Sequence, residues 1–287
     1  MIVRVGLCQF RAKTGDADKN LEIIRDLSGK AARMDADITV FPELALSGYM
    51  ARDEIFALAE PVTGHYVEEL TRIAEEYGLY LVVGMPELDE ETLMLYNSAV
   101  LVGPQGLVGV YRKRHLPSYG LFDEARYFKP FRGPIEVFDL PFGKVGLAVC
   151  YDLFFPEVVR AEVLRGAKLI ITISAAPDMS REHFETLVKA RAMENTVFVT
   201  YVNLVGFYEG IGFFGGSHIR GPLGELITKL GIHEEGVTVG EIDLAYLRSA
   251  REIRPFLGDV NMSDFSELYE TAVRGVITKP PSRHSQA

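Results

Sequence analysis

The sequence predicts an α/β protein, because apolar strand-like runs alternate with amphipathic helical segments along most of the chain. The runs are rich in β-branched residues, and several are apolar almost without interruption, as in strands that are covered on both faces. The strand-like runs begin at Ile2, Ala36, Leu79, Asn97, Val145, Leu169 and Val197.

Three segments between these runs have the spacing of amphipathic helices. The first covers residues 19–34 and the second residues 67–73, and in both the apolar side chains recur at intervals of three and four. The third begins at Pro156, which suits the first turn of a helix, and ends near Gly166, a plausible C-cap.

Composition limits the class of protein. The chain has 287 residues, of which 48% are hydrophobic and 24% charged, as in an ordinary globular protein with a sizeable core. The net charge of −10 repels nucleic acid and anionic lipid alike, so we expect neither as a partner. Two cysteines form no disulfide framework, and no signal segment or 18-residue apolar run is present, so we expect a cytoplasmic protein.

The domain organisation is expected to be simple. No linker rich in glycine, proline or serine interrupts the chain, and the repeat search finds only similar strand–helix units. We expect one domain over residues 1–270. Residues 271–287 are expected to be a C-terminal extension that is flexible or lies at an oligomer interface, because the last ten residues contain no apolar anchor.

Cys150 is the first candidate for chemistry. It follows a predicted strand and precedes the helix that begins at Pro156, and the carboxyl ends of strands are the usual place for active sites in α/β proteins. A nearby cation or helix N-terminus would depress the pKa of its thiol. The alternative is that Cys150, like Cys8 within the first strand, is a small buried hydrophobe.

Glu43 and Lys113 are further candidates. Glu43 lies between apolar residues just beyond a strand, where desolvation would suit a general base, although an exposed charge at a strand end is the commoner outcome. Strand alternation places Lys113 on the same face as Tyr111 and His115, and away from the neighbouring arginines. The sequence contains no histidine pair at i and i+4, no cysteine pair and no phosphate-binding glycine motif, so we expect no metal and no cofactor.

Four motifs occur in order: FPELALSGY, YRKRHL, FDEARYF and CYDLFFPE. Together they resemble the nitrilase superfamily of carbon–nitrogen hydrolases, in particular its amidase-like branch, and the likeness covers nearly the whole chain except the tail. The resemblance implies an αββα sandwich of two packed sheets with outer helices. It also implies a homodimer or a higher homo-oligomer.

The resemblance assigns roles to individual residues. The base of the family falls on Glu43, its lysine on Lys113, its nucleophile on Cys150 and its supporting glutamate on Glu124. In the implied reaction the thiol attacks an amide carbonyl, and the oxyanion is met by the lysine and the backbone N–H of Tyr151. A thioester is then hydrolysed, and no cofactor takes part.

The substrate is less narrowly defined. Tyr49, Tyr151 and Phe154 are expected to bind substrate, although aromatic residues near a motif often only fill the core. Phe154 stands where the family usually has arginine, which disfavours substrates that carry a carboxylate and favours a neutral or apolar acyl group. The chain contains no tryptophan, whereas true nitrilases commonly have one after the cysteine, so an amide is favoured over a nitrile.

The expected function is that of a cysteine-dependent amidase that converts a small amide to a carboxylic acid and ammonia. The alternatives within the superfamily are an N-carbamoyl amine or amino acid amidohydrolase and a nitrilase. Two other hypotheses are a thiol hydrolase that pairs Cys150 with His115 and a non-catalytic binding protein on the same fold.

Overall fold

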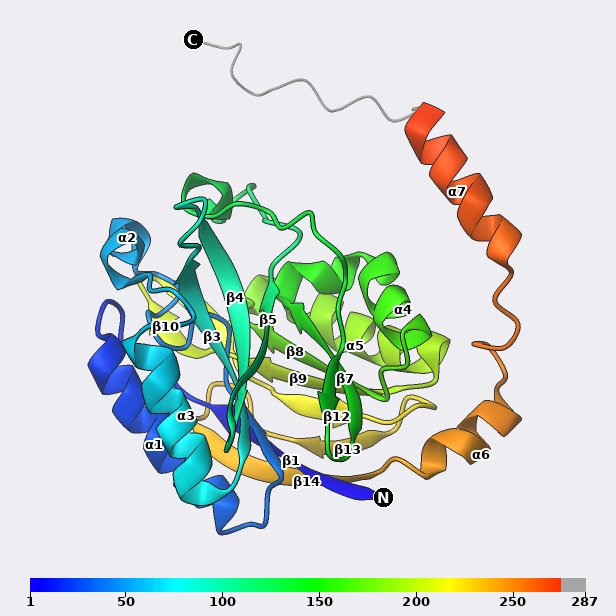
Figure 1. The fold of residues 1–287 in the computed structure, drawn as a ribbon, viewed down its shortest axis with the longest axis horizontal. Helices are drawn as coiled ribbons and strands as arrows, with labels where there is room; N and C mark the ends of the chain where they lie inside the picture. The colour runs from blue at the N-terminus through cyan, green and yellow to red at the C-terminus, as the bar shows by residue number, and fades with distance from the viewer. Residues whose placement is uncertain (275–287) are drawn as a thin grey trace.

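The computed structural model describes residues 1–274, which form two six-stranded sheets packed face to face with helices outside (Figure 1). The first sheet contains, in spatial order, β14 (Gly236–Asp243), β1 (Ile2–Gln9), β2 (Ile38–Val40), β3 (Tyr80–Leu88), β4 (Leu95–Gly103) and β5 (Gly106–Arg112). The second contains β13 (Leu226–Lys229), β12 (His218–Arg220), β9 (Phe198–Asn203), β8 (Leu169–Ser174), β7 (Gly143–Val149) and β6 (Phe138–Leu140).

Both sheets are mixed. In the first, β1, β2 and β3 run parallel and the outer strands are antiparallel. In the second, β7, β8 and β9 run parallel, with antiparallel strands on either side. A separate hairpin is formed by β10 (Val205–Tyr208) and β11 (Ile211–Phe214). The central parallel strands end at a common edge of each sheet, which is where the candidate site lies.

The longer helices cover the outer faces, so the predicted αββα sandwich is confirmed. Against the first sheet lie α1 (Ala17–Ala32) and α3 (His65–Tyr77), and against the second lie α4 (Pro156–Leu164) and α5 (Arg181–Asn195) (Figure 1). Asp16 caps α1 by accepting a hydrogen bond from the N–H of Lys19. The short α2 (Ile55–Leu58) lies in the connection between β2 and α3.

The core between the sheets accounts for the uninterrupted apolar runs in the sequence. Val5 and Leu101 from the first sheet and Leu147 and Ile171 from the second are fully buried in one cluster that spans both sheets. A second cluster lies between the first sheet and its helices. Strands that are covered on both faces need apolar residues at consecutive positions, because neither face meets water.

The strands and helices expected from the sequence are present, and one run needs correction. The run that begins at Val197 is not a single strand, since β9 ends at Asn203 and β10 begins at Val205. Asn203 explains the break, because its side chain accepts from the N–H of Ala176 at 2.8 Å and its N–H donates to Ser217 at 3.0 Å. These bonds fix the chain at the end of the strand.

The last described elements extend from the sandwich. Helix α6 (Tyr246–Ile253) is followed by α7 (Met262–Arg274), which projects away from the body of the molecule (Figure 1). The predicted boundary between residues 270 and 271 therefore falls inside α7, and residues 275–287 lie outside the described part of the chain.

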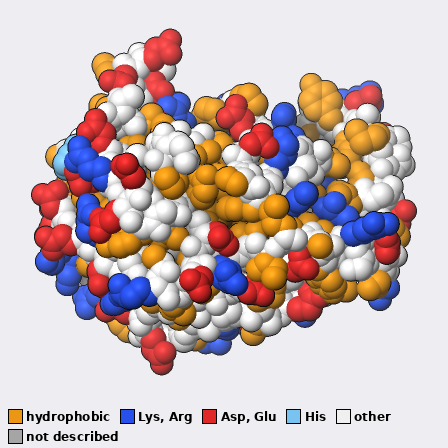
Figure 2. All heavy atoms as spheres, turned by 60° about the horizontal axis from the view of Figure 1, so that its bottom comes forward, with side chains coloured by type: hydrophobic (Ala, Val, Ile, Leu, Met, Phe, Trp, Pro, Cys, Tyr) orange, Lys and Arg blue, Asp and Glu red, His pale blue; other side chains and the backbone are white. Residues whose placement is uncertain are grey.

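The surface agrees with the acidic composition. Figure 2 shows acidic and basic side chains interspersed over one face, with apolar side chains between them. None of the helices within residues 1–274 is long and apolar enough to cross a bilayer.

Candidate active site

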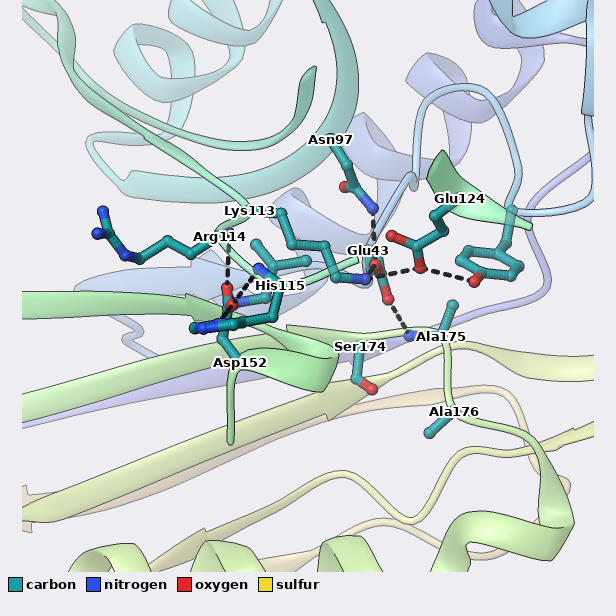
Figure 3. A network of polar contacts seen from close by, with 12 residues as sticks. Glu43, Asn97, Lys113, Arg114, His115, Glu124, Asp152, Ser174, Ala175 and Ala176 are labelled. Atoms are coloured by element: carbon teal, nitrogen blue, oxygen red, sulfur yellow. Dashed lines mark hydrogen bonds and ion pairs between the residues drawn. The ribbon is translucent and has the colours of Figure 1, made fainter. Parts of the chain in front are cut away.

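The candidate site is built from strand ends of both sheets. Glu43 follows β2 and Lys113 follows β5 in the first sheet, while Cys150 directly follows β7 in the second. Because the two sheets face each other, Glu43 and Lys113 lie in the interior rather than at the outer surface (Figure 3), and their charges act on the Cys150 thiol. Glu43, Lys113 and Glu124 are 0%, 0% and 4% exposed, and Cys150 is 6% exposed.

Glu43 is held by a tight turn after β2. The next residue, Leu44, has a φ of +49°, a conformation that few non-glycine residues adopt. The turn passes so close to β3 that a Cβ at Gly84 would lie 2.4 Å from the backbone nitrogen of Leu44. Only glycine fits at that position, and the close approach fixes where the Glu43 carboxylate points.

Lys113 lies between two carboxylates (Figure 3). Its ammonium donates to Oε1 of Glu43 at 2.6 Å and to Oε1 of Glu124 at 2.7 Å. Tyr49 donates to the same Glu124 oxygen at 2.7 Å. Three of the residues predicted from the sequence, Glu43, Lys113 and Glu124, therefore form one hydrogen-bonded cluster. Tyr49 stabilises this cluster through its bond to Glu124.

Buried charges shift the pKa values of this cluster. Burial alone would lower the pKa of Lys113, but the carboxylates of Glu124 and Glu43 outweigh it and raise that pKa well above its ordinary value. Burial, opposed by Lys113 and reinforced by Glu43, raises the pKa of Glu124 to about 7. The lysine is therefore a fixed cation, and Glu124 takes up a proton more readily than an ordinary carboxylate.

Cys150 begins a 3₁₀ turn over Cys150–Phe154 and has a φ of +48°. A non-glycine residue held there costs on the order of 1–3 kcal/mol and marks a constrained position. Burial raises the pKa of the Cys150 thiol, and the nearby Glu43 charge raises it further, while Lys113 opposes both. The expectation of a depressed thiol pKa is therefore wrong, because desolvation and a carboxylate outweigh the single cation.

Two partners of Glu43 were not anticipated from the sequence. Asn97 donates from its side chain to Oε1 of Glu43 at 2.7 Å, and the backbone N–H of Ala175 donates to Oε2 at 2.8 Å. Asn97 lies inside β4, where a polar residue is easily taken for a solvent-facing strand position, and Ala175 contributes only backbone. A polar residue in an otherwise buried strand was the one available signal for Asn97.

His115 belongs to a second cluster. Its ring nitrogen Nδ1 lies 2.8 Å from Oδ1 of Asp152, and the ring stacks on Phe155 with centroids 3.6 Å apart. Because a carboxylate only accepts, the proton of this bond is on the histidine. This bond leaves Nε2 free, as in a Ser–His–Asp triad, so it does not by itself decide whether His115 pairs with Cys150. The charges that act on the Cys150 thiol are those of Glu43, Lys113 and Glu124, which favours Glu43 over His115 as its base.

The aromatic residues expected to bind substrate lie around the Cys150 turn. The Tyr151 ring is 5.8 Å from that of Tyr119 and 5.2 Å from that of Phe154. Phe154 is half-buried and also packs edge-on against the buried Phe184, at 5.5 Å. Phe154 therefore contacts both the core, through Phe184, and Tyr151, the residue after the candidate nucleophile. Packing in the core and a place beside the candidate site are thus compatible.

A cavity of about 600 Å³ lies next to this cluster, on the side of Tyr49 and Glu124. Its charged lining is mainly acidic, and its two arginines are paired, Arg52 with Glu209 and Arg126 with Asp53. Within residues 1–274, no group of three or more metal-ligating side chains comes together.

A four-layer sandwich with a buried Glu–Lys–Glu cluster facing a cysteine at a strand end defines a protein of the nitrilase superfamily. The family model for carbon–nitrogen hydrolases matches residues 4–252, and the chain belongs to this family.

Individual relatives agree. The chain is 36% identical to a nitrilase of Pyrococcus abyssi over 253 residues, which are 87% of this chain and 93% of the relative. It is 34% identical to an (R)-stereoselective amidase of Pseudomonas sp., with coverage of 90% and 91%. The crystal structure of a carbon–nitrogen hydrolase from Helicobacter pylori G27 superposes with a TM-score of 0.87 at 26% identity, covering 94% of this chain and 99% of that one.

Proposed function

We propose that this carbon–nitrogen hydrolase is a cysteine-dependent amidase that converts a small amide to a carboxylic acid and ammonia. The observation that carries the proposal is the fully buried Lys113 ammonium, held between Glu43 and Glu124 close enough for its charge to act on the Cys150 thiol. A base, a cation and a nucleophile in one water-poor site are the groups that acyl transfer requires.

In the first half of the reaction, Sγ of Cys150 attacks the amide carbonyl carbon while Glu43 takes the thiol proton. The charge that develops on the carbonyl oxygen is stabilised by the Lys113 ammonium and the backbone N–H of Tyr151. The carbon–nitrogen bond then breaks, and Glu43 returns its proton to the nitrogen. Ammonia leaves as a neutral molecule, and the acyl group remains on Cys150 as a thioester.

In the second half, Glu43 takes a proton from a water molecule, which attacks the thioester carbon. The bond to Sγ breaks, the thiol regains its proton, and the carboxylic acid is released. The raised pKa of Cys150 supports this scheme, because a thiol that stays protonated at rest needs a base within reach. Glu124 and Tyr49 would hold Lys113 in position throughout.

The surroundings favour a neutral or positively charged substrate. Tyr49, Tyr151 and Phe154 would form an aromatic wall beside the thiol, and Phe154 offers no cation to a substrate carboxylate. In the neighbouring cavity, Arg52 and Arg126 are already held by carboxylates. An anionic substrate would therefore compete with existing ion pairs.

Nitrile hydrolysis is the second candidate, because one of the relatives is named a nitrilase. The same thiol would attack a nitrile carbon, and ammonia would again be released. Hydrolysis of N-carbamoyl amines would differ by releasing carbon dioxide as well.

The test is ammonia release from a panel of short aliphatic and aromatic amides, ω-amides, N-carbamoyl amines and nitriles, with Cys150→Ala as the control. We expect turnover of neutral amides and none by the variant. No turnover, together with no labelling of Cys150 by iodoacetamide, would instead favour a non-catalytic binding protein on this fold.

A further inference from the structure

Asp152 connects the two halves of the candidate site. It lies in the turn that begins at Cys150, on the second sheet, and its carboxyl is fully buried. On the first sheet, the chain leaves β5 at Arg112 and continues through Lys113 to His115. Figure 3 shows the Asp152 carboxylate facing the backbone of this segment, next to the Glu43 and Lys113 cluster.

Asp152 accepts hydrogen bonds from the segment that carries Lys113. Oδ1 accepts from the backbone N–H of His115 at 2.9 Å and from its ring at 2.8 Å. Oδ2 accepts from the Tyr111 hydroxyl at 2.9 Å and from the N–H of Arg114 at 3.4 Å. Both residues that follow Lys113 and a residue before it are thus bound to one side chain.

The same carboxylate also closes the turn of the nucleophile. Oδ2 lies 3.4 Å from the N–H of Val149, the residue before Cys150. The backbone of Asp152 contributes as well, since its carbonyl accepts from the N–H of Phe155 at 3.0 Å. The strained φ of +48° at Cys150 persists only if the surrounding contacts hold it, and these bonds lie on either side of it.

The remaining bonds of Lys113 do not reach the second sheet. Its backbone N–H donates to the carbonyl of Asn97 in β4, and its carbonyl accepts from the N–H of Phe131. β5 is the edge strand of its sheet, so one of its sides has no neighbouring strand to fix it. The position of Lys113 relative to Cys150 therefore depends on contacts between the sheets. The N–H of Ala175 holds Glu43, the partner of the Lys113 ammonium, whereas Asp152 binds residues on both sides of Lys113 and the turn of Cys150.

We propose that Asp152 is a positioning residue, which sets the distance between the Lys113 ammonium and the Cys150 thiol by tying both backbones to one carboxylate. This inference rests on the proposed function of those two residues. A reacting group displaced by about 1 Å can cost on the order of 100-fold in rate, so the effect belongs in kcat.

Glu162 provides a matched control. It is a second fully buried carboxyl, in α4, and a Cβ at Gly146 of β7 would lie 2.7 Å from its Cδ. Burial raises its pKa well above the ordinary value. Glu162→Gln therefore changes a buried carboxyl of the same sheet without removing any of the bonds made by Asp152.

The experiment compares Asp152→Asn, Tyr111→Phe and Glu162→Gln with the parent protein in kcat, KM, melting temperature and the rate at which iodoacetamide labels Cys150. We expect Asp152→Asn to lower kcat about 100-fold with KM changed by less than about threefold, and to slow labelling. Tyr111→Phe, which removes one bond, should lower kcat by about three- to tenfold, and Glu162→Gln by less than about twofold.

Equal losses of kcat in Asp152→Asn and Glu162→Gln, or an unchanged kcat in Asp152→Asn with only a lower melting temperature, would overturn the proposal. If Asp152→Asn fails to fold, Tyr111→Phe still decides, since an unchanged kcat there contradicts it. If the parent protein hydrolyses none of the panel, the proposed function fails. The labelling rates of Cys150 in the same variants then test the positioning role by themselves.

Discussion

The two cysteines of this chain are both buried, yet only one is in surroundings suited to chemistry. Cys8 lies inside β1, paired on both sides, within an apolar cluster. Cys150 lies one residue beyond β7, in a left-handed conformation, with the charges of Glu43 and Lys113 acting on it. Burial raises the pKa of both thiols.

The comparison separates burial from reactivity. A strand interior uses every backbone polar group in its ladder and surrounds the thiol with apolar atoms, so nothing there can remove a proton. A strand end frees the chain to turn, and it places Cys150 beside side chains from the facing sheet. The difference between the two thiols therefore lies in the base and the cation near Cys150.

The largest effect is expected for the nucleophile itself. Cys150→Ala should lower kcat by at least about 10⁴-fold, because no other group in the site can form the thioester. The measurement is ammonia release from the best amide of the panel. Cys8→Ala is the matched control and should keep its turnover, so a comparable loss in both variants would erase the distinction between the two thiols.

The cation is the next test. Lys113→Met keeps the length of the side chain and removes the charge, and we expect kcat/KM to fall by about 10²–10³-fold through loss of an oxyanion partner. Lys144→Met is the control, since Lys144 is half-exposed in a surface ion pair with Asp139. Near-parent activity in Lys113→Met would show that Cys150 does not depend on the buried cation.

The pH dependence of kcat/KM should show an acid limb near pH 7. Glu124 has a pKa raised to about 7 by burial, and protonation of Glu124 weakens its support of Lys113. At one pH unit below that value, kcat/KM should be about tenfold lower. A flat profile from pH 8 to about pH 5 would contradict this reading of the cluster.

The raised pKa of Glu124 also affects stability, but in the opposite direction: activity should fall at acid pH, whereas the contribution of Glu124 to stability should rise there. Between the ordinary value of 4.5 and about 7, the folded protein binds the Glu124 proton more tightly than the unfolded chain does. The contribution of Glu124 to the free energy of unfolding is therefore greatest at acid pH and falls as the pH rises through this window. Glu124→Gln should remove that slope, which thermal melts at several pH values would measure.

The smallest effect on activity is expected for Cys8→Ser. A hydroxyl without a partner in the apolar cluster should lower the free energy of unfolding by about 1–3 kcal/mol and leave kcat unchanged. Cys150→Ser should lower kcat and leave the free energy of unfolding nearly unchanged, because the Ser174 side chain is within hydrogen-bond reach of residue 150. Denaturant unfolding together with the ammonia assay gives both quantities, and similar stability losses in the two serine variants would contradict the contrast.

Much of the fold follows from the sequence because its strands are buried on both faces. Short runs of consecutive β-branched and apolar residues, such as LIITIS, predict buried strands. These runs alternate with amphipathic segments that predict helices, and the alternation gives the α/β class. The break at Leu204 was missed because it depends on the tertiary hydrogen bonds of Asn203, to Ala176 and Ser217. Local apolar character does not report such bonds.

The site was predictable where a residue's chemistry is unusual for its position. Glu43 stands out as a charge between apolar residues, strand alternation separates Lys113 from the neighbouring arginines, and the resemblance brings both together with Cys150 and Glu124. Asn97 and the N–H of Ala175 were not predictable, because one looks like an ordinary strand residue and the other is backbone. The role of Asp152 was not predictable either, because the backbone and side-chain donors that bind its carboxyl come from the other sheet.

The most direct test of the central claim is to look for the acyl group on the protein. The protein is mixed with its best amide substrate, quenched in acid during turnover, and mapped by peptide mass spectrometry. We predict a mass increase equal to the acyl group on the peptide that contains Cys150 and none on the peptide that contains Cys8. Turnover with an unmodified Cys150, in a protein whose Cys150→Ala variant is still active, would contradict the account.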